Sequence, residues 1–266
     1  MERSRQMNSK EWSIVIPALN EEKHISLCLE SVSNLNCCKN SIEIIVVDNG
    51  STDRTAAIAA HYTTDIDKKV LIIPHVTVGA LRNAGAEVSS GRFLAFLDAD
   101  CTVARSWLAL ATRLLSENPS SIAGAFYDVP EDAGWPARLW HRYLHPPRAG
   151  EVTYIPASNL LIEKSLFRQI GGFNAGLRTN EDSQLCAKAR LAGSKVLAFP
   201  ELTITHLGAE RTLLDFAKRQ LWHGSSVLNR DALRSNARAI GIGVYTWTCI
   251  CWLIIRILGA WRVLNQ

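Results

Sequence analysis

The 266-residue chain lacks several features that would point to a particular class of protein. Its seven cysteines are scattered and odd in number, and they have no zinc-site spacing, so neither a zinc site nor a disulfide framework is indicated. Such cysteine usage fits a reducing compartment best. No apolar signal segment precedes the first strand pattern, and no internal repeat or low-complexity tract occurs. From these observations we expect a globular protein whose catalytic part stays in the cytosol.

Charge is unevenly distributed along the chain. Residues 211–266 hold eight Lys/Arg against two Asp/Glu, whereas residues 1–210 hold 21 basic against 23 acidic residues. Basic and aromatic residues do not interleave in the first 210 residues, so we expect no nucleic-acid partner. The basic C-terminal part either contacts something anionic or solvates a helix face.

Short apolar runs alternate with helical patterns through the first half. We expect strands at residues 13–16, 42–47, 70–73, 92–97 and 122–127. Helices are expected from Asn20 to Leu35, from Thr52 or Asp53 to Ala60, and over residues 79–88 and 104–116. This alternation predicts an α/β fold, with a mostly parallel, Rossmann-like sheet covered by helices on both faces.

A proline-rich segment, residues 128–150, separates this half from a second one and reads as an irregular connection. Beyond it we expect strands at residues 159–162, 195–199 and 202–205, and helices at 164–170, 182–191 and 212–227. The predicted division is therefore residues 1–127, residues 128–230 as a second α/β half of the same domain, and residues 231–266 as a hydrophobic helix.

The hydrophobic helix rests on residues 239–255, which carry 17 uncharged residues including Trp247 and Trp252. This length is at the short limit for a membrane-spanning helix. A helix lying in the membrane interface, with its tryptophans at headgroup depth, is the second reading, and a buried core helix is the third.

Two aspartates, Asp98 and Asp100, follow directly after the apolar run at residues 93–97. The carboxyl ends of strands in open α/β sheets border the ligand crevice. Two carboxylates this close repel each other unless a cation lies between them, and hard oxygen ligands suit Mg²⁺ or Mn²⁺. Taken alone, the pattern is more typical of a turn in which Asp caps the next helix.

Three more polar segments follow the other predicted strands of the first half. They are Pro17-Ala18-Leu19-Asn20-Glu21, Asp48-Asn49-Gly50-Ser51-Thr52-Asp53 and Gly79-Ala80-Leu81-Arg82-Asn83-Ala84-Gly85. Together with Asp98-Ala99-Asp100, this set resembles the family 2 inverting glycosyltransferases, from about residue 12 to residue 222. The resemblance implies the type-A nucleotide-sugar fold, a nucleotide-sugar donor that we expect to be UDP-linked, and a Mn²⁺ or Mg²⁺ cofactor.

The resemblance also implies a donor site built from these strand ends. Its nucleotide-binding residues would be Pro17, Asn20, Glu21, Asp48, Gly50, Ser51, Arg82 and Asp98. Asp48 would accept a hydrogen bond from the base, Glu21 would meet the ribose, and Arg82 would neutralise the diphosphate or contact the sugar. Structural roles compete with these: a turn for Asp48, a first helical turn for Glu21, and a solvated helix charge for Arg82.

The metal is expected on Asp100, with Asp98 on the metal, its bound water, the ribose or the sugar. His206, which follows the last predicted strand, is the candidate third ligand, although a lone histidine is more often structural.

On the acceptor side, an inverting transfer needs a base that deprotonates the attacking hydroxyl. The resemblance assigns this role to Asp182, with Glu181 as the alternative, and neighbouring carboxylates can raise one pKa toward a working range. Capping of the next helix is the competing role. The acceptor or sugar pocket is expected to be lined by Ala157, Ser158, Asn159 and Trp222.

One departure from the family matters. Polymerising members carry Gln-x-x-Arg-Trp, whereas residues 218–222 read Lys-Arg-Gln-Leu-Trp, so single-sugar transfer is favoured. A nucleotidyltransferase is one alternative, disfavoured by the glycine-free loop at residues 17–21. A non-catalytic, membrane-bound nucleotide-sugar-binding protein is the other, disfavoured by the intact acids. We expect a metal-dependent transferase at the cytoplasmic face of the cell membrane, acting on a lipid-linked or glycan acceptor.

Overall fold

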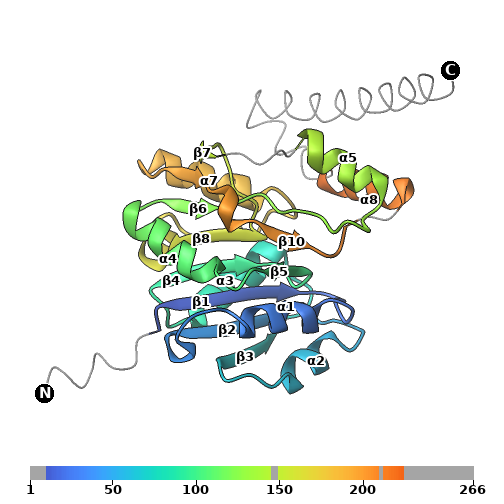
Figure 1. Cartoon of the computed structure of the whole chain (residues 1–266), viewed down its shortest axis with the longest axis horizontal. Helices are drawn as coiled ribbons and strands as arrows, with labels where there is room; N and C mark the ends of the chain where they lie inside the picture. Colours follow the sequence, from blue (N-terminus) through green and yellow to red (C-terminus); the bar gives the residue numbers. More distant parts are fainter. Residues whose placement is uncertain (1–9, 145–148, 210–211, 225–266) are drawn as a thin grey trace, which may run out of the picture. The chain divides into compact units, whose positions relative to one another are not determined.

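Strands and helices alternate through the first half of the chain, as the hydrophobic pattern predicts. The computed structural model describes residues 10–144, 149–209 and 212–224. Four parallel strands, β1 (Trp12–Ala18), β2 (Ile42–Asp48), β3 (Asp67–Ile72) and β4 (Phe93–Leu97), form one side of the sheet (Figure 1). β1, β2 and β4 are buried along their length, which explains their unbroken apolar character.

Four later strands extend the same sheet. They are β6 (Ile122–Gly124), β7 (Gly150–Glu151), β8 (Asn159–Glu163) and β9 (Val196–Ala198), and the order is β3-β2-β1-β4-β8-β6-β9-β7. β8 lies antiparallel to both β4 and β6, so the sheet is mostly parallel with a reversed strand at its centre. β5 (Cys101–Val103) and β10 (Ile204–His206) form a separate antiparallel pair.

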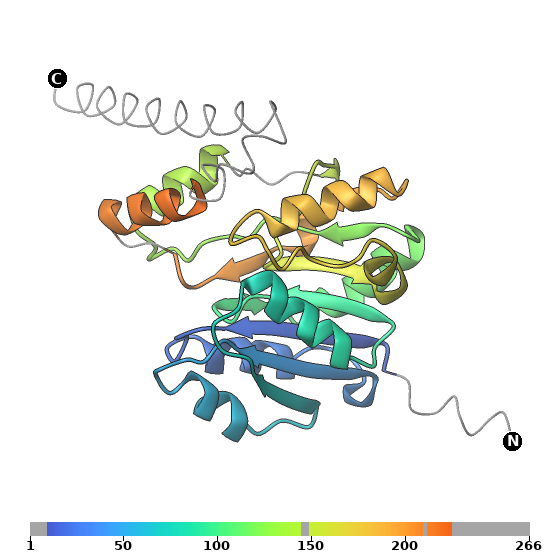
Figure 2. The ribbon, with the colours of Figure 1, turned by 180° about the vertical axis from the view of Figure 1, so that it is seen from behind.

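Helices cover both faces of the sheet, as predicted. α1 (Ile25–Ser33), α2 (Thr55–His61) and α4 (Trp107–Glu117) pack on one face. The other face carries α3 (Val78–Val88), α6 (Lys164–Gln169) and α7 (Glu181–Leu191), and Figure 2 shows α3 and α7 from that side. Side chains alternate between the two cores along β1, with Ile14 in one and Val15 in the other.

Two helices differ from the sequence prediction. The helix expected from Asn20 begins only at Ile25, because residues 20–24 turn instead to bond the loop after β2. The segment at residues 128–150 is not wholly irregular, since it contains α5 (Trp135–Leu144). Pro136 lies in the first turn of α5, where a missing N–H breaks no helical hydrogen bond, so this proline is compatible with a helix in the segment predicted to be irregular.

The chain divides into two compact units, residues 1–213 and residues 214–266. The first unit contains the sheet, with the short helices η1 (Lys39–Ser41) and η2 (Pro200–Leu202), and it ends within the predicted second half, residues 128–230. Helix α8 (Leu213–Gly224) begins at the last residue of the first unit, and its other residues belong to the second unit. Within the part of the chain that the structure describes, no helix is long and apolar enough to cross a bilayer. The hydrophobic helix predicted within residues 231–266 lies outside that part.

Candidate active site

Asp48 closes the turn after β2 with its own carboxylate. Its Oδ1 accepts hydrogen bonds from the N–H groups of Gly50 (2.9 Å) and Ser51 (2.8 Å), and its Oδ2 accepts one from the Ser51 hydroxyl at 2.6 Å. Gly50 has a φ of +78°, and a Cβ there would lie 2.8 Å from Pro74 Cβ, so the turn requires glycine. Asp48 therefore has the structural role in the turn that was one of its two predicted roles. A hydrogen bond to a nucleotide base would have to use the remaining lone pairs of this carboxylate, and the residue is only 1% exposed.

The loop after β1 is bonded to the loop after β2. The N–H of Asn20 donates to Ser51 Oγ at 2.9 Å, and Asn20 Oδ1 accepts from the N–H of Thr52 at 2.9 Å. Asn20 has a φ of +57°, a conformation that asparagine tolerates better than most residues. Pro17 lies in β1 beyond its last pair with β4, where a missing N–H costs no bond of that ladder. The predicted nucleotide residues of both strands thus share one hydrogen-bonded rim.

Three carboxylates gather beside this rim, from Glu21 after β1 and from Asp98 and Asp100 after β4. Burial raises the pKa of Glu21, and the negative charges of Asp100 and Asp98 add to the rise, whereas a hydrogen bond with His24 opposes it. The Glu21 Oε2 and His24 Nδ1 atoms are 2.8 Å apart. Three neighbouring carboxylates concentrate negative charge, and a cation among them would relieve it.

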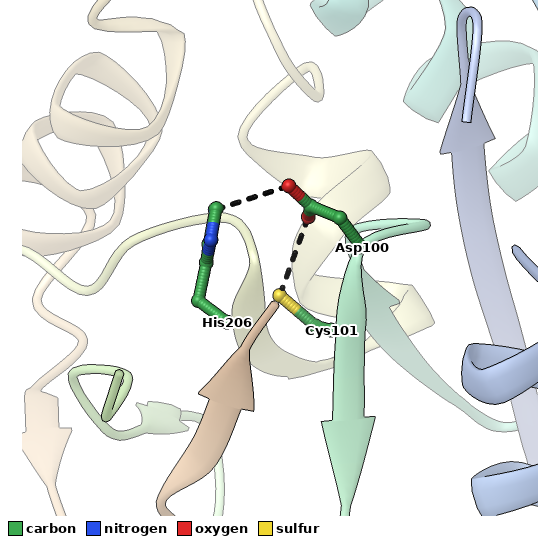
Figure 3. A group of neighbouring side chains, drawn as sticks. All are labelled: Asp100, Cys101 and His206. Atoms are coloured by element: carbon green, nitrogen blue, oxygen red, sulfur yellow. Dashed lines mark hydrogen bonds and ion pairs between the residues drawn. The ribbon is translucent and has the colours of Figure 1, made fainter. Parts of the chain in front are cut away.

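The residues best placed for a metal are Asp100, Cys101 and His206, whose ligand atoms lie within 4.8 Å of one another. Asp100 Oδ2 is 3.4 Å from His206 Nε2, and Cys101 Sγ is 3.6 Å from Asp100 Oδ1 (Figure 3). A Cβ on Gly208 would collide with Asp100 Oδ2, so this glycine leaves room for the carboxylate. Carboxylates suit Mg²⁺ or Mn²⁺ and imidazoles suit transition metals, so Asp100 and His206 together fit Mn²⁺ best of the two. Burial raises the pKa of the Cys101 thiol well above its usual value, which keeps the thiol protonated.

Arg82 connects the metal-side acids to the acceptor side. Its Nη2 is 2.7 Å from Asp98 Oδ1, and its Nη1 is 2.6 Å from Glu181 Oε1. The guanidinium is 4% exposed and lies over the Phe173 ring, 5.5 Å from the ring centroid. Asp98 therefore pairs with Arg82 and is not one of the trio Asp100, Cys101 and His206. Arg82 itself is buried between two carboxylates, so the alternative role of a solvated charge on a helix surface is wrong.

The two acids at the start of α7 have different surroundings. Glu181 is held in the ion pair with Arg82, and burial raises its pKa. Asp182 has weaker partners: Oδ2 accepts a long 3.4 Å hydrogen bond from Ala157 N–H, and Oδ1 accepts from Ser183 N–H at 2.6 Å. Burial also raises the pKa of Asp182. A raised pKa and an oxygen that is only loosely engaged suit a general base, so the geometry favours Asp182 over Glu181.

The predicted pocket stretch lies beside Asp182 and then enters the core. Ala157 and Ser158 are buried, and the Ser158 hydroxyl has no hydrogen-bond partner among the described residues. Asn159 serves the core: Oδ1 accepts from Trp107 Nε1 at 3.1 Å, and Nδ2 donates to the carbonyls of Ala125 and Leu202. The Nδ2 amino group is thus bonded to two carbonyls, and the Asn159 side chain is fully buried. Trp222 falls in α8, but its side chain is outside the described part of the structure.

Two features of the site escaped the sequence reading. Cys101 directly follows the Asp-Ala-Asp triplet, and its place in a strand paired with β10 could have been inferred only from knowing that pairing. The Arg82–Glu181 ion pair joins residues 99 positions apart, and no local pattern signals it.

Comparison with known proteins places the chain. The sequence model of glycosyl transferase family 2 matches residues 13–179, which include every strand-end motif described above. The chain belongs to glycosyl transferase family 2. Membership removes the nucleotidyltransferase alternative, which the glycine-free loop after β1 already disfavoured.

Curated relatives of this family-2 chain are longer than it is. It is 29% identical over 187 residues to glycosyltransferase AglE of Haloferax volcanii, covering 68% of this chain and 62% of that protein. It is 27% identical over 232 residues to the pre-mycofactocin glycosyltransferase of Mycobacterium tuberculosis, covering 82% of this chain and 47% of the relative. The chain therefore spans less than two thirds of either relative.

Solved structures share the fold at lower identity. The mannosyltransferase PcManGT of Pyrobaculum calidifontis, in complex with GDP-Man and Mn²⁺, superposes with a TM-score of 0.70 at 17% identity, covering 90% of this chain and 69% of that one. The S. aureus TarS fragment 1–349 with UDP-GlcNAc gives a TM-score of 0.63 at 22% identity, covering 82% and 67%. These likenesses establish the type-A fold of the family-2 chain.

Proposed function

We propose that this protein transfers one sugar from a nucleotide-sugar donor to a hydroxyl of a lipid-linked or glycan acceptor, with inversion and with the help of Mn²⁺ or Mg²⁺. The observation that carries the proposal is the placement of two sets of acids on either side of one arginine. Glu21, Asp98 and Asp100 lie at the ends of β1 and β4, and Asp182 begins α7 across Arg82. The family membership supports the same reaction class.

The roles follow from this geometry. A divalent cation held by Asp100 and His206 would neutralise the donor diphosphate as it leaves. The bonded rim of Asn20 and Ser51 would receive the nucleoside, with backbone N–H groups already fixed by folding. Asp182 would take the proton of the acceptor hydroxyl as its oxygen attacks the anomeric carbon from the face opposite the leaving diphosphate. A UDP donor remains our expectation; the TarS fragment was solved with UDP-GlcNAc, which agrees with it, whereas PcManGT was solved with GDP-Man, so the fold alone does not select the nucleotide.

Calorimetry of UDP binding with and without Mn²⁺ tests the donor and metal part. We expect Mn²⁺-dependent binding in the full-length protein and a loss of ~10-fold or more in affinity in Asp100→Ala. Asp67→Ala is the matched control, because Asp67 is an exposed acid that forms an ion pair with Lys10. Equal UDP affinity in the wild type and Asp100→Ala would refute the metal role of Asp100.

The membrane-borne acceptor is supported by the chain's C-terminal composition, with eight basic against two acidic residues from residue 211 on and 17 uncharged residues at 239–255. Basic residues near an anionic leaflet contribute about 1 kcal/mol each. We expect the full-length protein to sediment with vesicles that contain phosphatidylserine, and less with neutral vesicles at high salt. Recovery in the supernatant with both kinds of vesicle would contradict the membrane proposal, and with it the placement at the cytoplasmic face.

A further inference from the structure

Arg82 is a buried charge between the two sides of the site. It projects from α3, its side chain is 4% exposed, and each terminal nitrogen binds a carboxylate from a different part of the chain. Asp98 lies 16 positions away and Glu181 lies 99 positions away. The planar guanidinium holds its donors in a rigid fork, so it fixes the separation and orientation of the two carboxylates it binds.

The charges around Arg82 favour its staying bound to Asp98 and Glu181. One guanidinium faces the two carboxylates of Asp98 and Glu181, and Asp182 is the next acid along the chain. A buried ion pair that loses one member leaves an uncompensated charge, which is strongly unfavourable. Arg82 is therefore bound to its protein partners through both terminal nitrogens, whereas its buried Nε has no hydrogen-bond partner among the described residues.

Helix α3 also holds the loop that leads into α7. Asn83, next to Arg82, donates its Nδ2–H to Phe173 O at 2.8 Å and accepts the Phe173 N–H at 3.0 Å. At the start of the helix, the Thr77 hydroxyl donates to Ala175 O at 2.8 Å. α3 therefore fixes both the approach to α7 and, through Arg82, its first residue.

We propose that Arg82 is a positioning residue, which sets the base Asp182 at a fixed distance from the donor-side carboxylate Asp98 by holding Glu181. It acts through these carboxylates and is not a ligand of the donor. This inference rests on the proposed sugar transfer and names the device that aligns its two halves. A base displaced by about 1 Å from its productive position can lower the rate ~10²-fold, so this Asp98–Arg82–Glu181 bridge, called the strut below, should affect kcat.

The test compares Arg82→Lys with the wild type in the full-length protein. Lysine keeps the charge but lacks the two-armed fork. We expect kcat for transfer to fall ~10²-fold, while UDP affinity in the presence of Mn²⁺, measured by calorimetry, and the KM for the donor stay within ~3-fold. Arg92→Lys is the matched control, because Arg92 forms an exposed ion pair with Glu163, and it should leave all three quantities unchanged.

A second variant separates positioning from folding. Glu181→Gln keeps an oxygen for Arg82 but removes the charge, and it should lower kcat with UDP affinity retained. The double variant should lose no more than Arg82→Lys alone, because both changes break one strut. If Arg82→Lys does not fold, Glu181→Gln decides by the same two readouts.

Three results would overturn the inference. Parallel loss of UDP affinity and kcat would make Arg82 a donor ligand and would leave the proposed function standing. Unchanged kcat in folded variants would reduce the ion pairs to a structural role. Absence of transfer by the wild type, in an assay where UDP still binds, would refute the proposed function itself and the strut with it.

Discussion

Buried acids lie at both ends of the sheet, and the two groups differ in the number of hydrogen-bond donors around them. Near the start of β2, Glu43 is 2% exposed and accepts four hydrogen bonds, from the Ser13 hydroxyl, the Lys69 ammonium, and both the N–H and hydroxyl of Ser90. Burial alone would raise the pKa of Glu43, but these donors outweigh it and hold the pKa at about 2.

At the opposite end of the sheet, burial wins. The pKa values of Glu21, Glu181 and Asp182 are all raised, with burial as the largest cause in each case. A carboxylate whose lone pairs are all used stabilises the fold, whereas one left with few donors is held ready for a cation or a proton. The same residue types are thus divided into structure and chemistry by the number of donors around them.

The largest effect is expected at the chemical end. Asp182→Asn removes the proposed base while keeping size and shape, so transfer should fall by ~10²- to 10⁴-fold, with UDP binding unchanged. In the wild type, the rate should fall as pH drops through the raised pKa of Asp182, above the usual 3.8 of an aspartate, because the base must be ionised. A steady-state pH profile measures this. Full activity in Asp182→Asn, with loss in Glu181→Gln, would move the base to the neighbouring residue.

At the structural end, the expected effect is on stability. Glu43→Gln loses hydrogen bonds to a charged acceptor and should cost about 2 kcal/mol of unfolding free energy, measured by denaturant titration. Because the folded pKa is depressed, the stabilisation by Glu43 is present above pH 4.5 and is lost as pH falls toward about 2. The difference amounts to about 3 kcal/mol over that window, and Glu43→Gln should lack it.

Glu163→Gln provides the control for Glu43, since Glu163 forms an exposed pair with Arg92 at 3.3 Å. It should change stability by less than about 0.5 kcal/mol. If the stability of the Glu43→Gln protein depended on pH in the same way, other groups would cause that dependence. Glu43 would then not be the stabilising acid that the comparison of the two ends assumes.

The last effect is expected at the rim, where stability and UDP binding should change together. Gly50→Ala would place a methyl group against Pro74 at a φ of +78° and should cost about 1 to 3 kcal/mol of unfolding free energy. Gly193→Ala is a matched control, because Gly193 has a φ of +84° with nothing within 4 Å of an added Cβ. Calorimetry should find UDP binding weakened in Gly50→Ala only. Equal costs and unchanged binding in both variants would mean that backbone strain, not the close approach to Pro74, decides.

Local features of this fold were predictable, and long-range ones were not. The placement of Asp48, Asp98 and Asp100 at strand ends followed from apolar runs ended by acids, because parallel strands share their carboxyl edge. The start of α7 at Glu181 was predicted to within one residue. The proline-containing helix α5 was missed because proline is permitted in a first turn.

Tertiary partners account for the rest. Asn159 was expected in a sugar pocket, but its amide is used by Trp107 and by two carbonyls that only the folded sheet brings together. The sequence around Arg82 did not indicate its ion pair with Glu181. Nor did the sequence around Glu43 indicate its hydrogen bonds with Ser90, 47 positions away. Side-chain pairing across such distances depends on register and packing, which a single sequence does not encode locally.

The reciprocal bonds between Asn20, Ser51 and Thr52 have a consequence for redesign. Each loop supplies the acceptor for a backbone N–H of the other, so neither is an independent module. Exchanging one loop alone, to alter the nucleotide that is accepted, would leave an amide of the retained loop without its acceptor. A graft should therefore transplant residues 17–22 and 48–55 as one cassette, with Pro74 retained beneath the glycine.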